Sequence, residues 1–81
     1  MRRLYADFNE MVRPGVVHIH ARMQPDRQLP PLKEGEVVAL VEYGDGEEST
    51  AVLHRDTHTG EWQANMSESA SVTTAASSYT R

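Results

Sequence analysis

The second half of the chain alternates short apolar runs with short polar connections, which is a β-strand pattern. Residues 36–43 are rich in valine and leucine, residues 51–55 follow a segment rich in Gly and Glu, and residues 61–66 follow a turn. Apolar runs of this length between turn residues are typical of antiparallel strands joined by hairpins. The pattern predicts a three-stranded meander. Residues 36–43 are expected to be a central strand, because both of their faces are apolar.

The first half shows the same two-residue period. Apolar and polar residues alternate over residues 3–8 and again over residues 16–23, where His18 and His20 share the polar face. This period predicts two more strands, separated by a turn that contains Pro14. Residues 24–34 contain three prolines, which exclude a regular helix across that segment.

The register of the last hairpin follows from its loop. Residues 56–61 fit a four-residue loop in which Gly60 supplies a positive φ. Pairing Asp56 with Glu61 then places Leu53 opposite Ala64, and one face of the hairpin becomes apolar. A shift of one residue would scatter these apolar side chains over both faces. The even-length loop is therefore predicted.

Together these segments predict an all-β fold, either a small SH3-like barrel or a strongly curled five-stranded antiparallel sheet. Residues 34–40 resemble the second strand of SH3-like and Tudor barrels. The domain is expected to span residues 1–66. Residues 67–81 are rich in Ser, Thr and Ala and have few large apolar side chains, so we expect a flexible tail there.

Composition narrows the functional classes. The chain has 81 residues and no cysteine, which excludes disulfides and thiolate metal sites. No apolar run approaches the roughly 18 residues of a membrane span, and the first residues lack the apolar core of a signal peptide. These features predict a soluble cytoplasmic protein without a cofactor.

The charge is +3 over residues 1–33 and −7 over residues 34–66, within a total of −4. Such a division can orient two copies head-to-tail or attract a basic partner, but solvated surfaces that keep a small protein soluble are the preferred interpretation.

Several short motifs are arranged along the chain in a distinctive order. They are Tyr5-Ala6-Asp7-Phe8-Asn9, Gly15, Leu32-Lys33-Glu34-Gly35 and Trp62-Gln63-Ala64. In this order they resemble a family of small bacterial proteins without an established function. The resemblance covers residues 1–66 and implies a single intact domain with this strand order. It implies no activity.

Three groups of side chains are candidates for chemistry. His18 and His20 are two residues apart on one strand, a spacing that can present two imidazoles to one metal ion. No thiolate or carboxylate is evidently placed with them, so solvent-facing positions are the simpler interpretation and no metal site is predicted. Asp7 and Asn9 can serve acid–base chemistry, or Asp7 can instead stabilise the turn that follows the strand.

Aromatic residues at strand ends are the better candidates for binding. SH3-like and Tudor-like barrels bind ligands through exposed aromatic side chains. Trp62 is expected to belong to the core, whereas Tyr5 and Tyr43 are expected at the surface. The predicted partner-binding residues are Tyr5, Asp7, Asn9, Tyr43 and Arg55.

The sequence therefore predicts a non-catalytic interaction or accessory module that binds a protein partner or a second copy of itself. The alternative is a nucleic-acid- or ribosome-associated barrel that uses the Arg-rich N-terminal half. The negative net charge argues against nucleic acid as the main partner.

Overall fold

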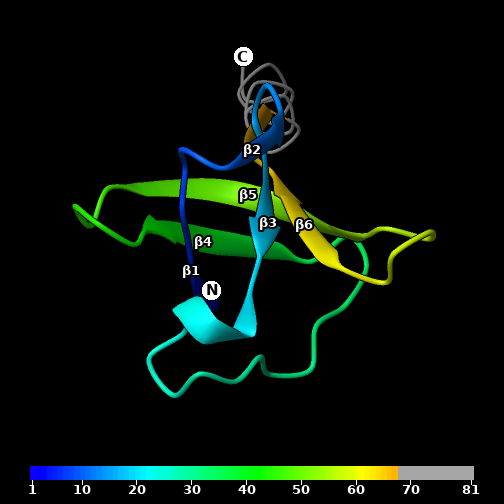
Figure 1. Cartoon of the computed structure of the whole chain (residues 1–81), viewed down its shortest axis with the longest axis horizontal. Helices are drawn as coiled ribbons and strands as arrows, with labels where there is room; N and C mark the ends of the chain where they lie inside the picture. Colours follow the sequence, from blue (N-terminus) through cyan, green and yellow to red (C-terminus); the bar gives the residue numbers. More distant parts are fainter. Residues whose placement is uncertain (68–81) are drawn as a thin grey trace, which may run out of the picture.

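The computed structural model describes residues 1–67, which form one curled sheet of six strands and a short 3₁₀ helix (Figure 1). The elements are β1 (Arg3–Ala6), β2 (Met11–Arg13), β3 (Val16–Ile19), η1 (Ala21–Met23), β4 (Val37–Glu42), β5 (Glu48–Arg55) and β6 (Trp62–Asn65). The predicted tail lies, apart from Ser67, outside the described residues. Within the described part, no helix is long and apolar enough to cross a membrane.

The strand order in the sheet is β1-β4-β5-β6-β3-β2. Three antiparallel hairpins, β2–β3, β4–β5 and β5–β6, supply most of the pairing, and β3 also pairs with β6. The all-β class and the strong curl are confirmed. The prediction of five antiparallel strands needs two corrections, because the sheet has a sixth strand, β2, and because β1 lies parallel to β4.

The core lies on the concave face of the sheet and takes alternate residues from five strands. Its buried members are Leu4, Ala6, Val17, Ile19, Val38, Leu40, Ala51, Leu53 and Ala64. Phe8, Leu29, Leu32, Trp62 and Met66 pack against this cluster and are partly buried. Trp62 is thus associated with the core, as predicted, and the proline-containing loop is attached through its two leucines.

The last hairpin has the predicted register. Leu53 pairs with Ala64 and Arg55 with Trp62, and Gly60 has a φ of 76°. The two-residue period is also right for the histidines, because Ile19 is buried while His18 is half-buried on the opposite face.

Three strand boundaries differ from the predicted ones by two or more residues. The first strand ends at Ala6 instead of residue 8, and the second ends at Ile19 because the chain turns into η1. The strand expected at residues 51–55 begins three residues earlier, at Glu48. The apolar pattern did not reveal this part of β5, because Glu48 and Thr50 are polar and exposed.

Strand β2 was missed because its three residues are all exposed. A strand without a buried face shows no hydrophobic alternation, so Met11–Arg13 was interpreted as part of the turn around Pro14. The turn itself is present, with Gly15 at a φ of 79°.

The curl brings β1 close to the end of β3, and the side chain of Gln24 joins them. Gln24 Nε2 donates hydrogen bonds to the carbonyl oxygens of Tyr5 and His20, both at 2.9 Å, while Oε1 accepts one from Tyr5 N at 2.9 Å. Gln24 is only 5% exposed. A buried amide with such partners replaces the backbone ladder that a closed barrel would have at this point.

Candidate functional site

The main hollow on the surface is a groove of about 380 Å³ between the edge strand β1, the end of β4 and the loop that follows η1. We call it the tyrosine–arginine groove. Its principal lining residues are Tyr5, Arg22, Met23, Gln24, Arg27 and Tyr43.

The two tyrosines reach the groove from neighbouring parallel strands. Tyr5 lies on β1, where Gln24 holds both of its backbone polar groups. Tyr43 follows directly after β4, and its N–H donates a hydrogen bond to the carbonyl oxygen of Ala6 at 2.8 Å. Tyr43 is 64% exposed, so its ring is presented to solvent by a backbone that is fixed to the sheet.

The two arginines come from the opposite wall. Arg22 lies in η1, and Arg27 lies in the next turn, where its N–H donates to the carbonyl oxygen of Gln24 at 2.9 Å. Arg27 has a φ of 59° and is the one non-glycine residue in the described part with a positive φ. A long side chain in this conformation costs of the order of 1 kcal/mol, and such residues concentrate at functional sites.

Neither of these guanidinium groups is neutralised within the described residues. Arg22 and Arg27 make no ion pair there, whereas Arg2 pairs with Glu36 and Arg3 with Glu48, both at 3.1 Å. The tyrosine–arginine groove therefore combines two unpaired cations with phenol rings. Such a surface binds carboxylates through charge-assisted hydrogen bonds and accepts apolar or planar groups on the rings.

The polar side chains that line the groove are phenols, guanidinium groups and one amide. No carboxylate and no imidazole is among them in the described part of the chain. Such side chains can bind and orient a ligand.

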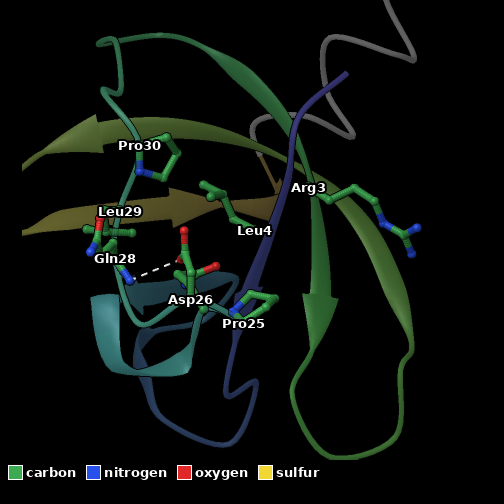
Figure 2. Close-up of a pocket in the computed structure, with 8 residues that line it drawn as sticks. Arg3, Leu4, Pro25, Asp26, Gln28, Leu29 and Pro30 are labelled. Atoms are coloured by element: carbon green, nitrogen blue, oxygen red, sulfur yellow. Dashed lines mark hydrogen bonds between the residues drawn. The ribbon is translucent and has the colours of Figure 1, made fainter.

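A second hollow, of about 200 Å³, lies on the other side of Gln24 and Pro25 (Figure 2). Its wall includes Leu4 and Leu29. Figure 2 shows the Arg3 side chain pointing away from the other lining residues, consistent with its ion pair to Glu48. We therefore regard this smaller hollow as the weaker candidate.

The structure brings together only two of the five predicted partner-binding residues. Tyr5 and Tyr43 line one groove. Asp7 and Asn9 follow β1 and form a turn, in which Asp7 Oδ1 accepts a hydrogen bond from Asn9 N at 2.9 Å. Neither is among the groove-lining residues.

Arg55 lies far from the groove, since it ends the eight-residue strand β5 whose other end pairs with β4 near Tyr43. Its Nε donates to the carbonyl oxygen of Gly60 at 3.1 Å, and its backbone N–H donates to Glu34 Oε1 at 2.9 Å. The hydrogen bond from Arg55, together with one from His54, lowers the pKa of Glu34. Through these contacts, Arg55 belongs to the hydrogen-bond network of the β5–β6 connection.

His18, on β3, and His20, just after it, are engaged separately. His18 Nε2 lies 3.7 Å from Glu61 Oε2, and His20 Nε2 lies 4.0 Å from Glu10 Oε2. The two rings meet edge-on, with centroids 5.5 Å apart. No group of three or more His, Cys, Asp or Glu side chains in residues 1–67 is arranged to hold a metal ion.

Arg22 and Arg27 were not predicted as site residues. The sequence pattern placed Arg22 on the outer face of a strand, and it gave Arg27 no role within the proline-containing loop. A usable signal was present, because Arg27 directly follows Pro25-Asp26, a pair that favours a turn, and Arg22 precedes it by three residues. Without the fold, however, nothing indicated that this turn faces Tyr43.

Comparisons of the chain with protein-family models, curated proteins and solved structures found no match. The resemblance to small bacterial proteins stays a prediction.

Proposed function

We propose that this protein is a non-catalytic interaction module that binds an acidic segment of a protein partner in the tyrosine–arginine groove. The observation that supports this most strongly is the pair of guanidinium groups, Arg22 and Arg27, left without an ion pair in the described residues. They face the same groove as the exposed ring of Tyr43. Tyr and Arg are the residue types that most often dominate binding energy at protein interfaces.

The state of the sheet edges also supports binding through side chains. At β1, the backbone of Tyr5 is already bonded to Gln24, so a partner strand cannot pair there without displacing that amide. At the other edge, β2 has only three residues and an irregular register with β3. Short or bulged edges resist strand addition. We therefore favour recognition through the side chains of the groove.

Single-stranded nucleic acid is the second candidate, because arginines beside tyrosine rings also suit stacked bases and phosphates. The net charge of −4 opposes it. So does the acidic connection between β4 and β5, which begins at Tyr43 and includes Asp45 and Glu47. We therefore favour a protein partner.

Photo-crosslinking from the groove tests the proposal. A benzoylphenylalanine at position 43 is expected to form a covalent adduct with a protein in the cells that make the chain. Benzoylphenylalanine at position 37 is the matched control. Val37 is 43% exposed, but it lies at the start of β4, whereas Tyr43 lies just after the end of that strand. We expect no adduct from position 37, and an adduct from both positions would count against a specific groove.

Two arginine variants make this test sharper. Arg22→Ala with Arg27→Ala is expected to abolish the adduct. Arg27→Gly removes one guanidinium and also the unfavourable φ, so it is expected to weaken binding while the melting temperature stays equal or rises. A labelled single-stranded RNA is the counter-probe. Tight RNA binding that falls with a log–log salt slope of about −0.7 per phosphate contact would favour the second candidate.

The location that we infer is the cytoplasm. The absence of cysteine suits a reducing compartment. Fractionation of cells that express the full chain checks this.

A further inference from the structure

The acidic connection between β4 and β5 is the charge complement of the tyrosine–arginine groove. Residues 43–47 are all exposed. Within residues 1–67 neither Asp45 nor Glu47 forms an ion pair, although Asp45 Oδ1 accepts a hydrogen bond from Glu47 N at 3.1 Å. The chain thus presents two unpaired carboxylates and, in the groove, two unpaired guanidinium groups.

These two surfaces adjoin each other, because Tyr43 belongs to both. Its side chain lines the groove, and its backbone begins the acidic connection, which projects at one end of the long axis in Figure 1. Within residues 1–67, Arg22 and Arg27 do not reach the carboxylates of Asp45 and Glu47, since no such pair lies within ion-pair distance.

Adjacent complementary surfaces allow a symmetric contact between two copies. In a two-fold arrangement, residue i contacts residue j of the other copy and j contacts i, so the association closes at two chains. On the basis of the proposed function, we propose that the acidic segment bound in the groove is residues 43–47 of a second copy. Each copy then inserts its connection into the groove of the other. Four ion pairs form the contact, together with Tyr5 and Tyr43 of each copy.

The strength of this contact is bounded by its chemistry. Ion pairs between exposed side chains contribute little each, typically 0–1 kcal/mol, and they are screened by salt. The tyrosine rings add apolar area at the centre, where an aromatic residue contributes most. We therefore expect a dimer that forms at micromolar or higher concentration and dissociates as ionic strength rises.

Reversing the charge of each surface by substitution tests the arrangement. Sedimentation of the full-length chain is expected to show a dimer at 50 mM salt and mainly monomer at 500 mM. The groove variant (Arg22→Glu with Arg27→Glu) and the connection variant (Asp45→Lys with Glu47→Lys) are each expected to be monomeric. Mixed in equal amounts, they are expected to form a dimer again, because each groove then meets a connection of opposite charge.

Arg13→Glu is the matched control, because Arg13 is an exposed arginine on β2 that does not line the groove. It is expected to leave the dimer intact. Circular dichroism of every variant establishes that it is folded. A wild-type chain that is monomeric throughout would overturn the inference, as would folded charge variants that fail to associate when mixed.

Failure of the dimer and failure of the proposed function give different results. An adduct from position 43 with twice the mass of the chain supports the dimer. An adduct of another mass, lost with the groove arginines, overturns the dimer and keeps the proposed function. Absence of any adduct, together with a monomeric chain, removes both.

Discussion

The two hairpin connections at opposite ends of the molecule have the same backbone but different roles (Figure 1). In the first, Glu42 N donates to the carbonyl oxygen of Glu47 at 2.7 Å, and Gly46 N donates to that of Glu42 at 3.0 Å. In the second, Asp56 N bonds to Glu61 and Gly60 N to Asp56, both at 2.8 Å. The glycines have φ values of 77° and 76°. Both loops are therefore the same four-residue turn.

The difference lies in the acidic residue that begins each turn. Asp56 bonds within its own hairpin, where Oδ1 accepts hydrogen bonds from His58 N at 2.7 Å and Thr59 N at 3.2 Å. Its Oδ2 accepts one from Gln63 Nε2, on β6, at 3.4 Å. Glu42 is 9% exposed and reaches further. One carboxylate oxygen accepts from Gly44 N at 3.2 Å, and the other accepts from Phe8 N, beyond the end of β1, at 2.7 Å.

Glu has one methylene more than Asp. This additional length lets the Glu42 carboxylate reach Phe8 N, outside its own turn. Glu42 fixes the chain as it leaves β1, next to the point where Tyr43 enters the groove. The groove therefore depends on a buried carboxylate that reaches β1, whereas the Asp56 carboxylate bonds within the β5–β6 hairpin.

The largest expected effect follows from removing these two carboxylates in turn. Glu42→Ala leaves Phe8 N and Gly44 N without acceptors in a partly buried position, and hydrogen bonds to a charged group contribute about 1.5–3 kcal/mol. We expect a loss of about 3 kcal/mol in the free energy of unfolding, measured by urea denaturation. Asp56→Ala is the matched variant and is expected to cost less. Equal losses would show that the two turns do not differ as described.

Gln24 holds β1 from its other side, and its removal has the next largest effect. Gln24→Ala leaves Tyr5 N and the carbonyl oxygens of Tyr5 and His20 without their partner. Unsatisfied buried polar groups cost about 1–3 kcal/mol, so we expect a loss of about 2 kcal/mol. The uncovered edge of β1 is also expected to increase self-association that salt does not reverse. Gln28→Ala, an exposed glutamine in the same loop, is the control and is expected to change neither property.

The same contrast explains what the sequence could predict. Local patterns predicted the second turn correctly, because Asp56, Gly60 and Glu61 indicate its length and the apolar residues of the two flanking strands indicate its register. The strand faces followed from the two-residue period for the same reason. The first turn was interpreted only as a loop, because its role depends on a residue 34 positions away in the chain.

The site was predictable only in part, for a similar reason. Tyr5 and Tyr43 were recognised because aromatic residues at strand ends carry their own signal. Arg22 and Arg27 carry no such signal. Their position in the groove depends on the 3₁₀ turn, which Gln24 stabilises through its hydrogen bonds to Tyr5. Side chains that bond across long sequence separations are not visible in periodicity or turn chemistry.

The glycines test whether the two backbones are truly equivalent. A Cβ at position 46 would meet nothing within 4 Å, and one at position 60 would meet only Arg55 Nη2 at 3.7 Å, an ordinary contact. The cost of alanine is therefore conformational at both sites, of the order of 1 kcal/mol. Gly46→Ala and Gly60→Ala are expected to lower the free energy of unfolding equally. A clearly larger loss at either position would show that its turn is held more tightly than the other.

The smallest expected effect is the acid sensitivity of the β5–β6 connection. The N–H groups of His58 and Thr59 lower the pKa of Asp56 in the folded protein, and those of Arg55 and the His54 side chain lower that of Glu34. In the unfolded chain both groups return to their ordinary pKa, so between the two values the unfolded state binds more protons. The stabilisation is therefore complete above the ordinary carboxyl range, roughly pH 4–4.5, and it is lost as the pH falls through the folded values.

Asp56→Asn combined with Glu34→Gln removes both carboxylates and so tests this window. Melting temperatures between pH 7 and pH 3 are expected to fall less steeply in the double variant than in the wild type, and the two curves are expected to converge at the acid end. Because both groups are exposed to water, the difference at pH 7 is expected to be small. A double variant that is as acid-sensitive as the wild type would place the titrating groups elsewhere. The acid response of the molecule would then not come from the β5–β6 connection and its contact with Glu34.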